Sequence, residues 1–133
     1  MVTIVDSGVW IDYFRGRTTR ATRLLARLLA AGKPLYVTDV VYGELLAGDP
    51  ATSERGMIET LRRDGWVVSL HDLDDMARAA ACRRAARRAG SPVRSFADCL
   101  IASVCIREGA TLLHDDRDFR TLASCTELRE LVP

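Results

Sequence analysis

Lysine and histidine are both scarce in this chain. Of its 19 Lys and Arg residues only Lys33 is a lysine, and the two histidines are His71 and His114. With so few histidines, no Ser–His–Asp or Cys–His arrangement for nucleophilic catalysis can be recognised. The net charge of +1 gives no bulk attraction to nucleic acid, so any binding of an anionic partner must rest on local clusters of arginine.

Metal-binding cysteine motifs and long apolar runs are also missing. The four cysteines form no C-x-x-C pair, and no histidine lies at zinc-ligand spacing from them. We therefore expect buried thiols in a reducing compartment. No apolar run reaches the roughly 18 residues of a membrane span, and the N-terminus has no basic region before an apolar one. These features predict a cytoplasmic protein.

The chain length of 133 residues predicts a single domain, residues 1–133. Along it, apolar segments with the periodicity of strands alternate with segments that have the periodicity of helices. Strands are expected at residues 2–6, 34–37, 66–70, 110–114 and 127–131, the last at an edge. Helices are expected at residues 7–16, 18–32, 38–48, 51–64, 73–89, 95–109 and 118–124, with Ser7, Thr38 and Ser95 as caps. This alternation predicts an α/β fold with a parallel sheet between helices.

Acidic residues stand where the first and fourth predicted strands end. Asp6 follows the apolar run 2–5, and Asp115 and Asp116 follow the run 110–113. Burial of an unpaired carboxylate is costly, so Asp6 needs a reason to be there. It could simply cap the next helix. In parallel sheets, however, ligands bind outside the carboxyl ends of the strands, which would bring these acids together.

Two helices carry further candidate acids. On a helix over residues 38–48, Glu44 shares a face with Val40 and Val41, although a position at the edge of that face is an equal alternative. Ser95 and Asp98 have the spacing of a capping box, which would also aim Asp98 toward the carboxyl end of the sheet. A helix cap and a chemical role do not exclude each other.

Carboxylates that meet in one cleft repel one another. At about 4 Å two such charges cost roughly 4 kcal/mol at an effective dielectric near 20. A cluster of this kind persists only if protons or cations neutralise it. Its ligands would all be oxygens, which favours Mg²⁺ or Mn²⁺ over zinc or iron. The chemistry that such a site supports is metal-assisted hydrolysis of phosphodiesters.

Four segments carry a resemblance to a known family: IVDSGVWIDYF at 4–14, VYGELLAG at 41–48, RSFADCLIAS at 94–103 and LLHDDRDF at 112–119. In this order and at these separations, they resemble the PIN-domain ribonucleases, and among them the VapC-type toxins of bacterial toxin–antitoxin pairs. The resemblance runs nearly end to end. It implies a three-layer fold with a central parallel sheet of strand order 3-2-1-4-5.

The resemblance also implies roles for individual residues. The implied catalytic acids are Asp6, Glu44, Asp98 and Asp116, of which Asp6, Asp98 and Asp116 would hold the metal. Ser7 and Asp118 would support them, Ser7 by holding a carboxylate or a metal-bound water with its hydroxyl. The family often has Thr or Ser where this chain has His114, so the resemblance assigns that histidine no role.

As a function, the resemblance implies a magnesium-dependent endoribonuclease in which manganese can replace magnesium. Its substrate would be structured RNA, often transfer RNA, and its products would carry 5′-phosphate and 3′-hydroxyl ends. Cleavage would inhibit translation and growth. A small VapB-type antitoxin would neutralise the toxin, and the toxin itself would form a homodimer. The alternative is a catalytically silent module that keeps the fold and binds RNA or protein.

Phosphate-binding residues are expected in the basic segment 83–94. Arg94 and Ser95 precede Asp98 and would lie nearest the metal, and Arg87 is a further candidate. The alternative for these arginines is a solvated helix face. A receiver-like phosphoacceptor domain is disfavoured because it needs a lysine late in the chain, whereas Lys33 lies in the first third.

Overall fold

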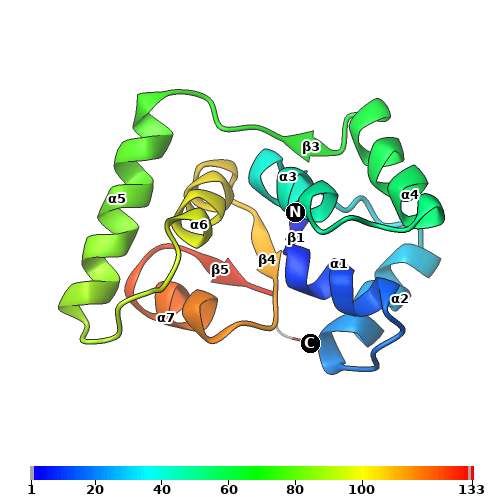
Figure 1. Ribbon diagram of the computed structural model, residues 1–133. Coiled ribbons are helices and arrows are strands. Elements are labelled where there is room, and N and C mark those ends of the chain that lie inside the picture. Colours follow the sequence, from blue (N-terminus) through cyan, green and yellow to red (C-terminus); the bar gives the residue numbers. More distant parts are fainter. Residues whose placement is uncertain (1, 132) are drawn as a thin grey trace.

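The computed structural model describes residues 2–131 and 133 and shows alternating strands and helices. The strands are β1 (Thr3–Val5), β2 (Val37–Thr38), β3 (Val67–Val68), β4 (Thr111–Leu113) and β5 (Arg129–Glu130). The helices are α1 (Ser7–Phe14), α2 (Arg20–Ala30), α3 (Asp39–Ala47), α4 (Thr52–Arg63), α5 (Leu73–Arg88), α6 (Phe96–Glu108) and α7 (Arg117–Cys125) (Figure 1). The α/β class and the position of every predicted element are confirmed, with ends that differ by a few residues.

All strand pairs are parallel, but they form two groups. β4 lies between β1 and β5, with Ile4 opposite Leu112 and Leu112 opposite Glu130. Within residues 2–131 and 133, β2 pairs with β3 alone. In the same residues a single bridge joins the groups, because the backbone N–H of Tyr36 donates to the carbonyl of Thr3 over 2.9 Å and its own carbonyl accepts from Val5 N over 3.0 Å.

The predicted order 3-2-1-4-5 therefore holds across the Tyr36 bridge, whereas a continuous five-stranded ladder does not form. Two residues explain the interruption. Pro34 has no N–H to donate to a ladder. At the other end of the segment, Thr38 is the N-cap of α3, so the extended backbone ends there. Only a few residues remain to pair with β1.

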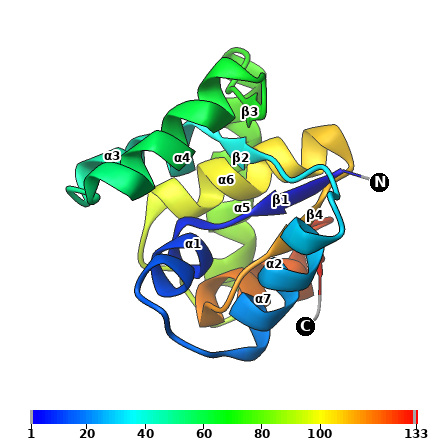
Figure 2. The same cartoon turned by 90° about the vertical axis from the view of Figure 1, so that its right-hand side faces the viewer.

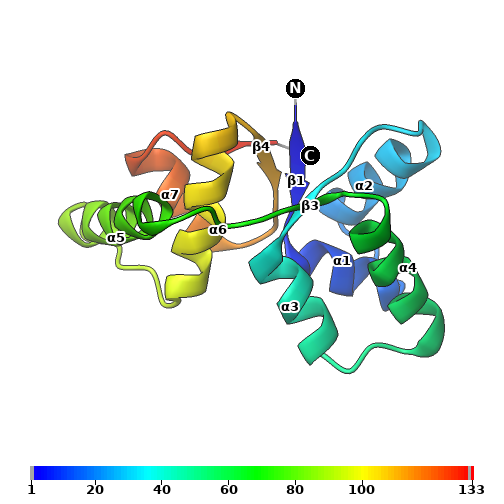
Figure 3. The same ribbon diagram turned by 90° about the horizontal axis from the view of Figure 1, so that it is seen from above.

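Helices lie on both sides of the strands. Seen from above, α5, α6 and α7 are grouped on one side of β1, and α1 to α4 on the other (Figure 3). After a quarter turn about the vertical axis, β1 and β2 run across the middle of the molecule with α6 beside them (Figure 2). Large side chains that are fully buried, among them Trp10, Ile101 and Phe119, fill the space between the layers.

The cysteines contribute to this core. Cys82, Cys99 and Cys105 are buried free thiols, as predicted, whereas Cys125 is only half-buried. Burial raises the pKa of the Cys105 thiol well above its usual value. No helix within residues 2–131 and 133 has the length and apolar character needed to cross a bilayer.

A buried ion pair holds the helices on the α5 side together. Asp75, 1% exposed, accepts hydrogen bonds from the guanidinium groups of Arg78 on its own helix and of Arg107 on α6. Its carboxylate also accepts from the backbone N–H of His71 over 2.8 Å. Burial alone would raise the pKa of Asp75, but these donors together lower it. The network fixes α6, which carries one of the candidate acids.

Candidate functional site

Asp6 leaves the carboxyl end of β1 and begins α1. It is 8% exposed, and its Oδ2 accepts a hydrogen bond from Gly8 N over 3.3 Å. The prediction that Ser7 caps this helix is wrong, because Asp6 is the cap and Ser7 is the first helical residue. Burial, with the charges of Asp98 and Glu44, raises the pKa of Asp6 to about 7. Asp6 therefore caps α1 and is also a carboxyl whose charged form is destabilised in the fold.

Ser7 and Glu44 contact each other across the gap between α1 and α3. The Ser7 hydroxyl donates to Glu44 Oε1 over 3.2 Å. Glu44 is exposed, while Val41 and Leu45 are the buried residues of α3. The alternative of an edge position is therefore the right one for Glu44, which lies beside the apolar face and turns its carboxylate toward solvent and Ser7.

Asp98 lies in the first turn of α6 without completing the capping box. Ser95 is the cap, as predicted, but its hydroxyl accepts from Ala97 N over 3.1 Å. Within the described part of the chain, the Asp98 carboxylate accepts no hydrogen bond. Burial is the largest cause that raises its pKa to about 6, and the charges of Asp116 and Asp118 add to it. This carboxylate is thus available to a ligand.

Asp116 caps α7 and contacts Arg94. Its Oδ1 accepts a hydrogen bond from Asp118 N over 2.9 Å and lies 3.6 Å from Nη2 of Arg94. Asp118, 4% exposed, accepts from both the backbone N and Nε of Arg94, over 3.2 and 3.1 Å. Burial alone would raise the pKa of Asp118, but these contacts with Arg94 lower it. Asp118 is thus the anchor of Arg94.

The acids predicted from the sequence therefore meet at the carboxyl ends of β1 and β4. Burial is the largest cause of the raised pKa values of Asp6 and Asp98, and the charges of the other acids add to it. Among the described residues, however, no three acidic, histidine or cysteine side chains are placed closely enough to hold a metal ion.

The donor set still fits a hard divalent cation, because it consists of carboxylate oxygens in a partly buried, mutually repulsive cluster. The carboxylates that would hold such a cation are those of Asp6, Asp98 and Asp116. A cation would offset the burial and the mutual repulsion that together raise the pKa values of Asp6 and Asp98.

The predicted RNA-binding residues fall into two groups. Arg94 lies beside the acids with 69% of its side chain exposed, and Ser95 follows it. Arg87 lies in the last turn of α5 and is exposed, and within the described residues no hydrogen bond or ion pair joins it to the acids. The structure therefore brings Arg94 to the site and leaves Arg87 outside it.

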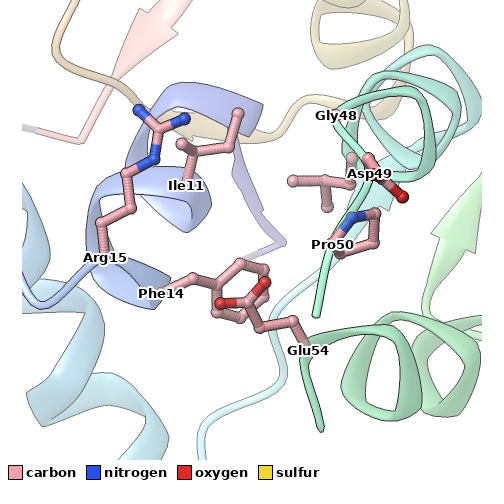
Figure 4. A pocket seen from close by; sticks show the side chains of 8 residues that line it. Ile11, Phe14, Arg15, Gly48, Asp49, Pro50 and Glu54 are labelled. Atoms are coloured by element: carbon pink, nitrogen blue, oxygen red, sulfur yellow. The ribbon is translucent and has the colours of Figure 1, made fainter. Parts of the chain in front are cut away.

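A pocket lies one helical turn beyond the contact of Ser7 with Glu44, between residues of α1 and the end of α3. Ile11 and Gly48 each follow one of these residues by four, so they lie one turn further along. They line this pocket together with Phe14, Arg15, Leu45, Asp49, Pro50 and Glu54. Figure 4 shows Arg15 and Phe14 coming from α1 and Glu54 from the opposite wall. The pocket adjoins the acids without containing them.

The PIN domain family matches residues 3–124 of this chain. The chain belongs to the PIN-domain family. It is 35% identical over 127 residues to VapC ribonuclease Mb1587 of Mycobacterium bovis and equally to ribonuclease VapC11 of Mycobacterium tuberculosis. Each match covers 95% of both chains. The predicted PIN-domain and VapC ribonuclease family is confirmed, and with it the enzyme class.

Solved PIN-domain structures have the same fold at much lower identity. FitAcB from Neisseria gonorrhoeae superimposes with a TM-score of 0.72 at 17% identity, over 98% of this chain and 97% of that one. VapBC-1 from nontypeable Haemophilus influenzae gives a TM-score of 0.69 at 19% identity, with the same coverage. These likenesses confirm the fold of the PIN domain and do not bear on its substrate.

One part of the site was not predicted. His114, to which the sequence assigned no role, accepts a hydrogen bond from the backbone N of Asp116 and contacts Glu130 of β5. No local pattern links residues 114 and 130, since they become neighbours only when β4 and β5 pair. The one available signal was the histidine itself, directly before the acids that follow β4.

Proposed function

We propose that this PIN domain is a magnesium-dependent endoribonuclease toxin, in which manganese can replace magnesium. The observation that carries the proposal is the cluster of Asp6, Glu44, Asp98 and Asp116, whose shared charge and burial raise the pKa of Asp6 to about 7 and of Asp98 to about 6. The curated relatives named as VapC ribonucleases support RNA as the substrate.

In this proposal Asp6, Asp98 and Asp116 hold the cation. When bound, it polarises the phosphoryl group and lowers the pKa of a water molecule. Glu44 orients the attacking water and accepts its proton, with the carboxylate held by Ser7. Arg94, anchored by Asp118, contacts the phosphate. Because water is the nucleophile, the products carry 5′-phosphate and 3′-hydroxyl ends.

The finer parts of the proposal concern substrate and partners. We expect structured RNA, in particular transfer RNA, in the cytoplasm, so that cleavage inhibits translation and growth. A VapB-type antitoxin is the expected partner, supported by the similarity in fold to VapBC-1 and FitAcB. We also expect residues 1–133 to form one PIN domain that pairs as a homodimer.

The decisive experiment compares purified wild type with Asp6→Asn and Asp98→Asn on total RNA. With Mg²⁺ or Mn²⁺ the wild type should cut a discrete set of RNAs, and a chelator should stop it. Both variants should lose cleavage by at least about 100-fold, since each removes a metal ligand. Sequencing of 5′-phosphate ends identifies the RNA and the bond.

Two outcomes would count against the proposal. Cleavage by both variants at the wild-type rate would show that the acids are not the site. Folded wild type that binds RNA but never cuts it, with either metal, would favour the silent binding module. Asp12→Asn is a matched control, because this carboxylate lies on α1 but forms an ion pair with Arg17 and is not one of the proposed site acids.

A further inference from the structure

His114 connects the acid Asp116 to the edge strand of the sheet. Its Nδ1 accepts a hydrogen bond from the backbone N of Asp116 over 3.1 Å, and its Nε2 lies 2.8 Å from Oε1 of Glu130. The histidine follows β4, and Glu130 lies on β5 opposite Leu112. One side chain therefore spans from β5 to the loop that carries Asp116.

These two contacts determine which nitrogen of the imidazole ring carries the hydrogen. The backbone N–H of Asp116 can only donate, so Nδ1 must present its lone pair. The hydrogen then resides on Nε2, which donates to the carboxylate of Glu130. Glu130 thus orients the ring, and the ring in turn orients the backbone of Asp116.

The surroundings of His114 leave the ring little freedom. It is 7% exposed, and its centroid lies 5.2 Å from that of Phe119, which is fully buried. Asp116 is held at three points: its backbone N–H by His114, its Oδ1 by the backbone N of Asp118, and the same oxygen near Arg94. Removal of His114 would leave the loop without the contact that ties it to the sheet.

We infer that Glu130 and His114 are positioning residues, which orient Asp116 for its role through the hydrogen bond between His114 Nδ1 and the Asp116 backbone. The inference rests on the proposed function insofar as Asp116 holds the cation. It extends the proposed site beyond the acidic cluster, to His114 and to Glu130 on β5. Neither residue is expected to touch RNA or metal.

Two substitutions of His114 separate the contacts of the ring. In His114→Asn the amide oxygen takes the place of Nδ1 and can still accept from Asp116. In His114→Gln the amide nitrogen takes the place of Nε2, so the bond to Asp116 is lost. Both variants lose the packing against Phe119. If His114 had only a structural role, both variants would have lower melting temperatures. Neither the exchange of the Asp116 amide nor the affinity for Mn²⁺ would then differ between them.

The first readout needs no metal. In the wild type, ¹⁵N shifts of the ring should show hydrogen on Nε2, and the Asp116 amide should exchange slowly with solvent. Exchange should accelerate by about 5-fold or more in His114→Gln, as expected for loss of a bond worth about 1 kcal/mol or more, and less in His114→Asn. Hydrogen on Nδ1, or equal exchange in the two variants, would overturn the inference.

The second readout is Mn²⁺ affinity, measured by calorimetry on folded protein. His114→Gln and Glu130→Ala should bind Mn²⁺ about 10-fold more weakly than wild type. His114→Asn should lose less affinity, and Glu130→Gln, which keeps an oxygen acceptor, should bind close to wild type. Glu127→Ala is the matched control, an exposed acid in the same segment. Wild-type affinity in both His114→Gln and Glu130→Ala would overturn the inference.

The two readouts also separate this inference from the proposed function. If wild type binds Mn²⁺ and cuts RNA while the His114 variants behave alike, the function stands and the positioning role fails. If wild type binds no metal at all, the proposed function fails. The order of amide exchange in the two variants then still decides whether His114 orients Asp116.

Discussion

The hydroxyl of Ser7 donates a hydrogen bond to Oε1 of Glu44 over 3.2 Å. Ser7 is the first residue of α1, and Glu44 lies within α3, so this contact joins two helices that enter the site from different strands. It also gives the exposed carboxylate of Glu44 a defined direction. An unrestrained glutamate would sample several rotamers, and a proton acceptor for water needs a fixed position.

We therefore expect Ser7→Ala to lower kcat for RNA cleavage by about 5-fold, the effect of losing a hydrogen bond of about 1 kcal/mol. The melting temperature should hardly change, because the contact is exposed. Single-turnover kinetics and thermal melts check both parts. Ser53→Ala, a serine on α4, is the control. An unchanged kcat in Ser7→Ala would remove Ser7 from the proposed site.

Neutralising Asp6 should stabilise the metal-free protein. Its pKa is about 7 in the fold, above the ordinary value of 3.8, so the folded state binds the proton more tightly than the unfolded state. Stability of the metal-free protein should accordingly fall as the pH rises from about 4 to about 7. Asp6→Asn, which can still cap α1, should raise the free energy of unfolding near neutral pH by on the order of 1 kcal/mol.

Urea titrations of both proteins in chelator, at several pH values, measure this difference. The two curves should converge as the pH falls, because Asp6 of the wild type then becomes protonated. If Asp6→Asn were less stable than wild type at every pH, the charge of Asp6 would not destabilise the folded state.

Divalent cations should stabilise the wild type most at alkaline pH. Protons compete with metal for Asp6 and Asp98, whose pKa values are raised to about 7 and about 6. At a metal concentration about 100 times the Kd, the gain should be about 2.7 kcal/mol. Melting temperatures with Mg²⁺ or Mn²⁺ at about pH 8 and about pH 5.5 check this, with Asp98→Asn as control. An equal rise at both pH values would argue against binding by these carboxylates.

Replacement of Arg94 should impair cleavage more than replacement of Arg83. Arg94 lies between Asp116 and Asp118 with most of its side chain exposed, whereas no contact of Arg83 with the acids is seen in the described residues. Arg94→Ala should raise KM and lower kcat, and Arg94→Lys should recover only part, because a lysine cannot contact two carboxylates through a planar group. Equal or reversed effects of Arg94→Ala and Arg83→Ala would contradict the phosphate role.

Much of the site could be predicted because its acids stand next to strong local signals. Asp6 and Asp116 directly follow the apolar runs of β1 and β4, and parallel strands bring their carboxyl ends to one edge. Ser95 marks the start of α6 and thereby places Asp98 in its first turn. Local pattern and sheet topology together predicted where these residues lie, whereas the choice of Asp116 over Asp115 came from the resemblance to PIN-domain ribonucleases, and the roles of these residues stay predictions.

Other features depend on geometry that spacing does not encode. Asp6 and Ser7 are both good caps, and only the backbone conformation decided for Asp6. Glu44 faces solvent because α3 buries Val41 and Leu45, a rotation that a short helix does not specify. The contact of His114 with Glu130 arises from strand pairing between distant segments. Sequence patterns were insufficient where backbone conformation or helix rotation decided, and gave no signal for the contact of His114 with Glu130, which are neighbours in space but far apart in sequence.

The bridge at Tyr36 divides the acids between two parts of the backbone. Asp6 and Asp116 follow β1 and β4 of the three-stranded group, whereas Glu44 lies on the helix that follows β2. Main-chain hydrogen bonding is thinnest between these groups, and segments joined by few such bonds move most readily. A small tilt of β2, β3 and α3 changes the position of Glu44 and leaves the spacing of Asp6 and Asp116 unchanged. The hydrogen bond from Ser7, which follows β1, to Glu44 is the contact that would hold the proposed proton acceptor in place against such a tilt.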